Sequence, residues 1–199
     1  YAKELWKICY PQSVGSLEDD EDASRLITEP ARNTKTRQSE GGCLNFTDRR
    51  VVQKIIHVTN RHPYLIQYLG CQLIDYMNRN HTDVVNLYDC DEVLKDLVAN
   101  QTHPALRLMW DEFEGRPHQK LLQILAKSSD DKKTDIDLSE ISASYKEIGI
   151  NMSIEQILEL CQSLEDADLI RSSSSEKGTK SFYLSMPLFR MWLKQNKSY

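Results

Sequence analysis

Three polar residues, Asn60, Arg61 and His62, stand directly before Pro63, and their types and position favour the binding of an anion. Proline suits the first turn of a helix, because its φ is fixed and it lacks an amide hydrogen. The apolar residues that follow have the spacing of one helical face: Leu65, Ile66, Leu69, Leu73 and Ile74. The polar residues would therefore lie at a helix N-terminus, where free amide groups and the helix dipole attract negative charge. The same pattern is typical of a helix that only packs in a core, and the residues alone leave both interpretations open.

The run that contains these residues, VTNRHPYLIQYLGCQLI, resembles the lid-helix signature of STAND-type signalling ATPases within the AAA+ class. That signature reads Thr-Gly-Gly-His-Pro-Tyr-Leu-X-Gln, and the matching positions are Thr59, His62, Pro63, Tyr64, Leu65 and Gln67. Asn60 and Arg61 replace the two glycines. In that family the turn approaches the bound nucleotide from the lid side. The resemblance therefore implies that Arg61, His62 and Pro63 contact ATP or ADP, with Mg²⁺, in a longer parent protein, where Arg61 would act as a phosphate-sensing arginine.

The segment SVGSLEDDEDASRLITEPA predicts a helix that Ser16 caps, that carries acidic residues in its first turn and that stops before Pro30. It also resembles the family's connection between the ATPase core and the lid, on Leu17, Leu26, Ile27, Glu29 and Pro30. The chain begins with Tyr inside a plausible helix. We therefore expect a fragment whose partner, an upstream ATPase core, belongs to the same chain.

The second half of the chain predicts a winged helix after a boundary at Gly115-Arg116-Pro117. Helical patterns from Pro117, from Leu138 and from Ser153 are followed by two short strand patterns and a closing helix from Pro187. The phrases LEDADLI and SFYLSMPLFRMWLKQN resemble the winged-helix exit and the closing helix of the same family. We expect a mainly α fold: a helical lid bundle over 1–114, then a winged-helix domain with a small β-hairpin over 115–199.

The charge of the helix expected over 154–168 indicates whether this winged helix binds DNA or protein. Winged helices often place their third helix in the major groove of DNA. Here that helix carries five acidic residues and no Lys or Arg, and 111–199 hold 12 Lys and Arg against 15 Asp and Glu, a net charge of −3. Such a surface repels phosphates. We therefore expect protein partners rather than specific nucleic-acid binding, and keep the DNA-binding winged helix of archaeal origin-recognition ATPases as the alternative.

The chain lacks the motifs that would make it an enzyme. No glycine-rich loop of the form G-x-x-x-x-G-K-[ST], no Walker B strand and no G-x-S-x-G occurs, and the cysteines and histidines are scattered without metal-ligand spacing. We predict that this fragment is not catalytic and holds no cofactor or metal by itself. A helical protein-binding module without any nucleotide role remains a further alternative, which an upstream Walker A motif in the parent would exclude.

The composition of the chain indicates its class of protein and its location in the cell. The 199 residues include 40% hydrophobic residues and carry a net charge of −5, which fits a packed domain and argues against a dedicated nucleic-acid binder. No apolar run is long enough to span a membrane, and five cysteines scattered without pairing fit reduced thiols. We expect a cytoplasmic protein without membrane contact.

Overall fold

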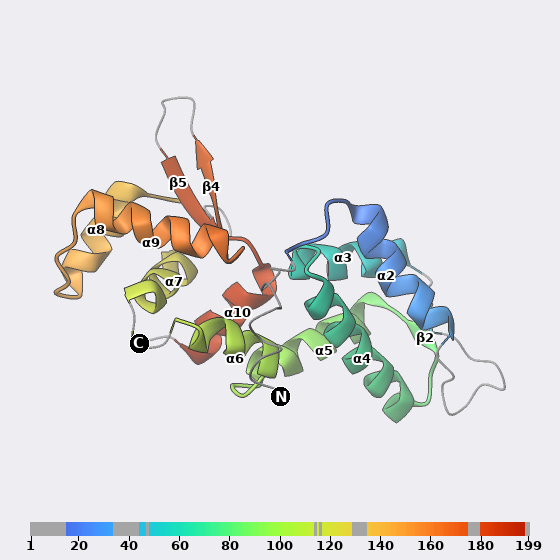
Figure 1. Ribbon diagram of the computed structural model, residues 1–199. Coiled ribbons are helices and arrows are strands. Elements are labelled where there is room, and N and C mark those ends of the chain that lie inside the picture. Colours follow the sequence, from blue (N-terminus) through green and yellow to red (C-terminus); the bar gives the residue numbers. More distant parts are fainter. Residues whose placement is uncertain are drawn as a thin grey trace, which may run out of the picture.

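The computed structural model describes residues 15–33, 44–46, 48–113, 115, 117–128, 135–174 and 180–197. In these residues the fold is mainly helical, with a few short strands, which confirms the predicted fold class. The helices form two groups, one built from the first half of the chain and one from the second (Figure 1). None of the helices within this described part is both long and apolar enough to cross a membrane.

The first group consists of four helices and a two-stranded parallel sheet: α2 (Asp20–Asn33), β1 (Asn45–Phe46), α3 (Arg49–Thr59), α4 (Pro63–Asn80), β2 (Val84–Val85) and α5 (Leu87–Ala99). The central element is α4, which contacts both α2 and α5. Its buried side is the predicted apolar stripe, with Ile74 half-buried at its edge and Met77 added at its end. Periodicity therefore predicted correctly which face of this helix enters the core.

The helix α2 begins later and ends later than the sequence predicted. Its first turn is capped by Asp19, whose Oδ1 accepts a hydrogen bond from the amide of Asp22 at 2.7 Å, and Ser16 lies outside the helix. The helix also continues through Pro30 to Asn33, so the predicted stop was wrong. A proline inside a helix removes a backbone hydrogen bond. Here the helix is held by tertiary contacts, because Ala23 is buried and α2 packs along α4 and α3.

The second group contains three helices and a three-stranded antiparallel sheet, after a short connecting helix. The connecting helix is α6 (Pro104–Asp111). The elements of the second group are α7 (Pro117–Ser128), β3 (Ile136–Asp137), α8 (Leu138–Glu147), α9 (Ile154–Asp166), β4 (Ile170–Ser174) and β5 (Lys180–Leu184). The strand order is β3-β5-β4, and the β4–β5 hairpin projects beyond the helices (Figure 1). The helix α9 begins with a capping box, in which the side chains of Ser153 and Gln156 each accept from the other's backbone amide. The helix order and the hairpin are as the sequence analysis expected, whereas the strand β3, which pairs with β5, was not predicted.

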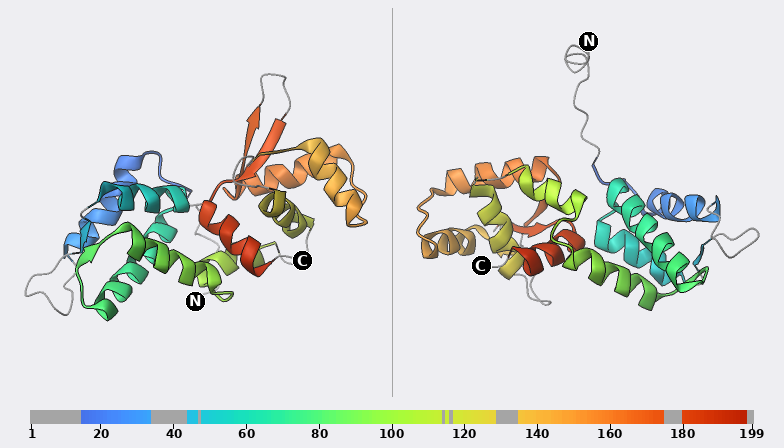
Figure 2. Two further views of the ribbon diagram at one scale, coloured as in Figure 1. Left: turned by 180° about the vertical axis from the view of Figure 1, so that it is seen from behind. Right: turned by 90° about the horizontal axis from the view of Figure 1, so that it is seen from below.

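The closing helix α10 (Pro187–Asn196) packs against both groups. It contacts α3 and α5 on one side and α7 and β5 on the other, and both views of Figure 2 show it between the two groups. The chain does break where expected, since α6 ends at Asp111, α7 begins at Pro117 and Gly115 has φ +68°. Yet the buried apolar residues of both groups form one continuous cluster. The division into 1–114 and 115–199 remains a prediction.

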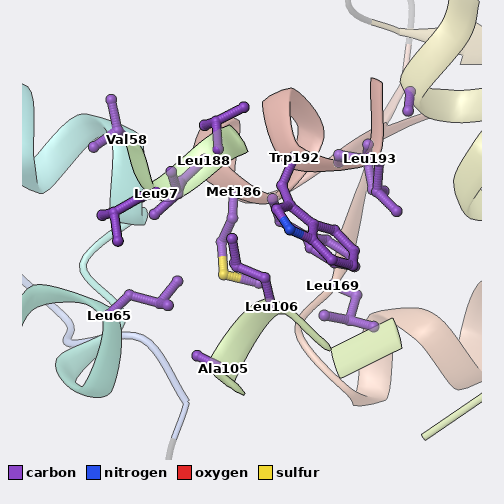
Figure 3. Close-up of a cluster of buried hydrophobic side chains, with 14 of the residues drawn as sticks. Val58, Leu65, Leu97, Ala105, Leu106, Leu169, Met186, Leu188, Trp192 and Leu193 are labelled. Atoms are coloured by element: carbon purple, nitrogen blue, oxygen red, sulfur yellow. The ribbon is translucent and has the colours of Figure 1, made fainter. Parts of the chain in front are cut away.

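Trp192 lies at the centre of this shared core. Its indole is fully buried, and the apolar side chains around it include Leu106 from the connecting helix and Met186 from the segment before α10 (Figure 3). Its Nε1 donates a hydrogen bond to the carbonyl of Asn100 at 2.9 Å. Close by in sequence, the side-chain amide of Asn196 donates to the carbonyl of Val98 at 2.7 Å. The helix α10 thus donates to two carbonyl groups at the C-terminal end of α5, and the carbonyl of Asn100 also accepts from the amide of His103 at 3.2 Å.

Candidate functional site

The turn between α3 and α4 has an unusual backbone. Asn60 and Arg61 both lie in the left-handed region, with φ +48° and +59°. The amide of Arg61 donates to the carbonyl of Ile56 at 3.1 Å, and the amide of Asn60 donates to His57 at 3.2 Å. This pairing is the Schellman arrangement that ends many helices, usually with glycine at the left-handed position. The turn links α3 to α4 within a few residues, and the two helices contact each other.

Buried Thr59 fixes the start of this turn. Its side chain is fully buried, and its hydroxyl donates to the carbonyl of Ile55 at 2.7 Å. Its own carbonyl accepts from the amide of His62 at 3.0 Å. A hydroxyl that bonds back into its own helix is satisfied without water, which suits a residue in the core. Thr59 therefore has a structural role at the base of the turn.

Arg61 holds the connector that precedes α2. Its guanidinium Nη1 donates to the carbonyl of Glu18 at 2.9 Å and lies 3.7 Å from a carboxylate oxygen of Asp20. Its carbonyl also accepts from the amide of Leu17 at 3.0 Å. Arg61 is therefore paired with a carboxylate in this chain. Asp20 is largely exposed, so this ion pair is weak and easily replaced.

His62 and Pro63 form the N-terminus of α4. Pro63 occupies the first helical position, as predicted, and His62 makes no side-chain hydrogen bond to the first turn. Within the described residues, the amides of Tyr64 and Leu65 also have no backbone acceptor. Burial lowers the pKa of His62, and the nearby Asp168 carboxylate opposes this shift. His62 is thus neutral near pH 7, and Arg61 is the cation at this helix N-terminus.

Asp168 joins the second helical group to this turn. Its Oδ2 accepts hydrogen bonds from the amide and the hydroxyl of Ser16 at 3.2 and 2.8 Å, and its Oδ1 lies 3.6 Å from Arg171. Asn60 belongs to the same cluster, because its side-chain amide nitrogen donates a hydrogen bond to the hydroxyl of Ser16 at 3.5 Å. Asp168 also has φ +56°, and its carbonyl accepts from Ser185. The structure therefore brings together the connector, the α3–α4 turn and the end of α9.

Sequence reasoning placed Arg61, His62 and Pro63 together but missed Ser16 and Asp168. The local signal at Asp168 is weak: an Asp just after a helix often tolerates the left-handed conformation. No local pattern indicates that its carboxylate would meet Ser16. Two cavities lie near α3, of about 580 and 280 Å³, and neither is lined by the three predicted residues. Neither of these two cavities therefore includes the N-terminus of α4.

The described residues offer no constellation for metal binding, because they contain no group of three or more His, Cys, Asp or Glu side chains placed to hold an ion. The buried thiols are also unreactive: burial raises the pKa of Cys90 to about 11 and that of Cys161 to about 12. What the site offers chemically is one cation, a helix N-terminus and a polar cluster between two groups of helices. Comparison with known protein families and with curated proteins gave no match for this sequence.

Proposed function

We propose that this chain is the lid and winged-helix region of a nucleotide-switched signalling ATPase of the STAND type. The observation that carries the proposal is the backbone at Asn60 and Arg61. These residues occupy the two positions at which the similar lid signature has glycine, and both have positive φ. Glycine adopts such a conformation without steric cost, whereas other residues do so rarely. The turn that the signature's glycines favour is thus kept in a chain that lacks them.

In this proposal Arg61 senses a nucleotide phosphate and transmits the change to the connector. A phosphate group offers several oxygens to a guanidinium, and charge-assisted hydrogen bonds of this kind are stronger than those to neutral groups. Phosphate would replace exposed Asp20 as the partner of Arg61. The contact between Arg61 and Glu18 would then change too. Nucleotide state is thereby coupled to the segment that leads into α2, while His62 and Pro63 line the approach to α4.

The second helical group supports a winged helix that contacts protein. The order α7-β3-α8-α9-β4-β5 and the sheet order β3-β5-β4 are those expected of that domain. The face of α9 that remains exposed carries Glu155, Glu159 and Asp166. This acidic face disfavours the DNA backbone and favours a protein surface of opposite charge. The helix that would read DNA therefore acts in protein contact.

The decisive experiment replaces Arg61 by Ala in the longer parent protein and measures both nucleotide affinity and turnover. We expect at least a tenfold change in one of them, equivalent to about 1.4 kcal/mol. The matched control is Arg107→Ala, which removes another arginine from an exposed ion pair, the one with Asp111 on α6. Changes below about threefold for Arg61→Ala, or an equal effect of the control, would leave the motif with a packing role only.

Whether the winged helix binds DNA is tested separately, in a fluorescence anisotropy titration of duplex DNA with the present chain at physiological salt. We expect only weak, sequence-independent binding, at dissociation constants no tighter than roughly micromolar. Sequence-specific binding below that range would replace the protein-contact proposal by the DNA-binding alternative. The proposed role of Arg61 does not depend on this result.

A further inference from the structure

The smaller cavity, of about 280 Å³, lies where α3 ends and α10 begins. Its lining includes His57 and Asn60 from α3 and its turn, Tyr183 at the end of β5, and Pro187 and Arg190 from α10. None of its lining residues is Asp or Glu. The larger cavity differs in this respect, because carboxylates as well as lysines line it. The smaller cavity is therefore the one whose charge favours an anion.

Arg190 is the cation of this cavity. Three arginines are half-buried in the described part of the chain, and two of them, Arg61 and Arg171, lie beside a carboxylate. Arg190 alone among these three has no ion pair. A half-buried guanidinium is costly to desolvate without a partner of opposite charge. An anion in the cavity would supply that partner.

The first turn of α10 lies next to this cavity, which Pro187 and Arg190 line. Pro187 occupies the first helical position and lines the cavity, and Met186 provides no side-chain cap. The amides of Leu188 and Phe189 have no acceptor among the described residues, and both side chains are buried. Unsatisfied amides at the start of a helix bind anions, since the helix dipole favours negative charge there.

From the cavity and the unpaired Arg190, with the free amides of the adjacent helix turn beside them, we infer that this pocket binds a phosphate group. The side chains of Tyr183 and His57 stand at the same cavity and can add hydrogen bonds to phosphate oxygens. The volume accommodates inorganic phosphate, pyrophosphate or the terminal phosphate of a larger molecule, whereas a whole nucleotide is at the scale of larger pockets. This site does not depend on the proposed role of Arg61, because neither Arg61 nor Pro63 lines it.

The test is a titration of the present chain with inorganic phosphate, followed by ¹H–¹⁵N NMR at constant ionic strength in a phosphate-free buffer. We expect saturating shifts that are largest at the amides of Leu188, Phe189 and Arg190. Replacing Arg190 by Gln should weaken binding at least roughly tenfold, because a charge-assisted pair is lost. The control Arg49→Gln removes an exposed arginine from the start of α3 and should leave the affinity unchanged.

Shifts that do not saturate, that spread over the surface, or that survive Arg190→Gln unchanged would overturn the proposal. Should that variant not fold, Tyr183→Phe gives an independent answer, since it removes only the hydroxyl. It should weaken binding about threefold, and unchanged affinity would again contradict the site.

A second arm replaces phosphate by ADP. Shifts of the same amides at equal or lower concentration would identify a nucleotide's terminal phosphate as the occupant. Shifts with phosphate alone would identify a free anion, and no shift with either would reject the site. Because the present chain is tested alone, failure here leaves the Arg61 experiment in the parent protein to be decided separately.

Discussion

Ser16 and Asp168 lie 152 residues apart in the chain, and the amide and hydroxyl of Ser16 both donate to the same carboxylate oxygen of Asp168. The carboxylate is also close to Arg171 and to His62. This contact connects the segment before α2 to the end of α9. It therefore couples the two helical groups independently of the apolar core, at the same turn that carries Arg61.

Breaking this contact should cost stability in a way that shows coupling. Ser16→Ala and Asp168→Asn should each destabilise the chain, and the double variant should be destabilised by less than the sum of the two. We expect a coupling energy of about 1–2 kcal/mol, because the hydrogen bond is to a charged group that is partly exposed. Urea unfolding followed by circular dichroism measures all the variants. Ser16→Ala combined with Glu159→Gln on exposed α9 should be additive. Additive values for Ser16 and Asp168 would show that the contact contributes nothing in solution.

The left-handed conformation of Arg61 gives a matched pair of variants. Arg61→Ala and Arg61→Gly remove the same ion pair and hydrogen bond. Only glycine adopts φ +59° without strain, so the glycine variant should be more stable than the alanine variant by about 1 kcal/mol. At Gln53, an exposed position inside α3, the order should reverse, since glycine is the poorer helix former. Denaturant midpoints at equal m-values provide the comparison, and an alanine variant as stable as the glycine variant would refute the assigned backbone.

Trp192 should be the side chain whose loss affects both helical groups most. Trp192→Ala removes a fully buried indole and should cost about 3–5 kcal/mol. Trp192→Phe should cost less, about 1–3 kcal/mol, because it removes part of the buried ring and one of the two hydrogen bonds that the carbonyl of Asn100 accepts. Hydrogen exchange should show reduced protection in α5 and in α7, since α10 packs on both. Loss confined to one group would contradict the shared core. The control Tyr88→Ala, at a side chain that is 66% exposed, should change stability by about 0.5 kcal/mol or less.

Stability should fall when the pH drops below about 6.5. Burial lowers the pKa of His103, and of His62, from the ordinary value of 6.5. The unfolded chain therefore binds protons more readily than the folded chain, so this stabilisation is complete above pH 6.5 and is lost as the pH falls through the lower folded pKa. Protonation would also remove the acceptor at His103 Nδ1, which receives the amide of Leu106.

The variant His103→Asn keeps an acceptor for this helix cap but does not titrate. We expect its free energy of unfolding to depend less on pH between about 5 and 7 than that of the unmodified chain. Some dependence should remain, because His62 is unchanged. His57→Gln, at an exposed position on α3, is the control and should retain the full dependence. An unchanged slope in His103→Asn would exclude His103 as the cause.

The sequence by itself determined the elements whose signals are local. The helix from Pro63, its buried stripe, the capping box of Ser153 and the hairpin before Pro187 all depend on residues within a few positions of one another. Periodicity and capping act over that range, so reading the chain in order is sufficient. The break at Gly115 was also visible locally.

Only the tertiary structure decided which of these elements meet. Ser16 was predicted to cap a helix, but its hydroxyl donates to Asp168. The helix α2 continues through Pro30 and packs against α4. Neither outcome has a local signal, since the energy comes from residues far along the chain. The position of α10 is of the same kind. Its amphipathic pattern predicts a buried face but does not indicate which helices cover that face. Only the tertiary packing shows that both groups of helices contact it.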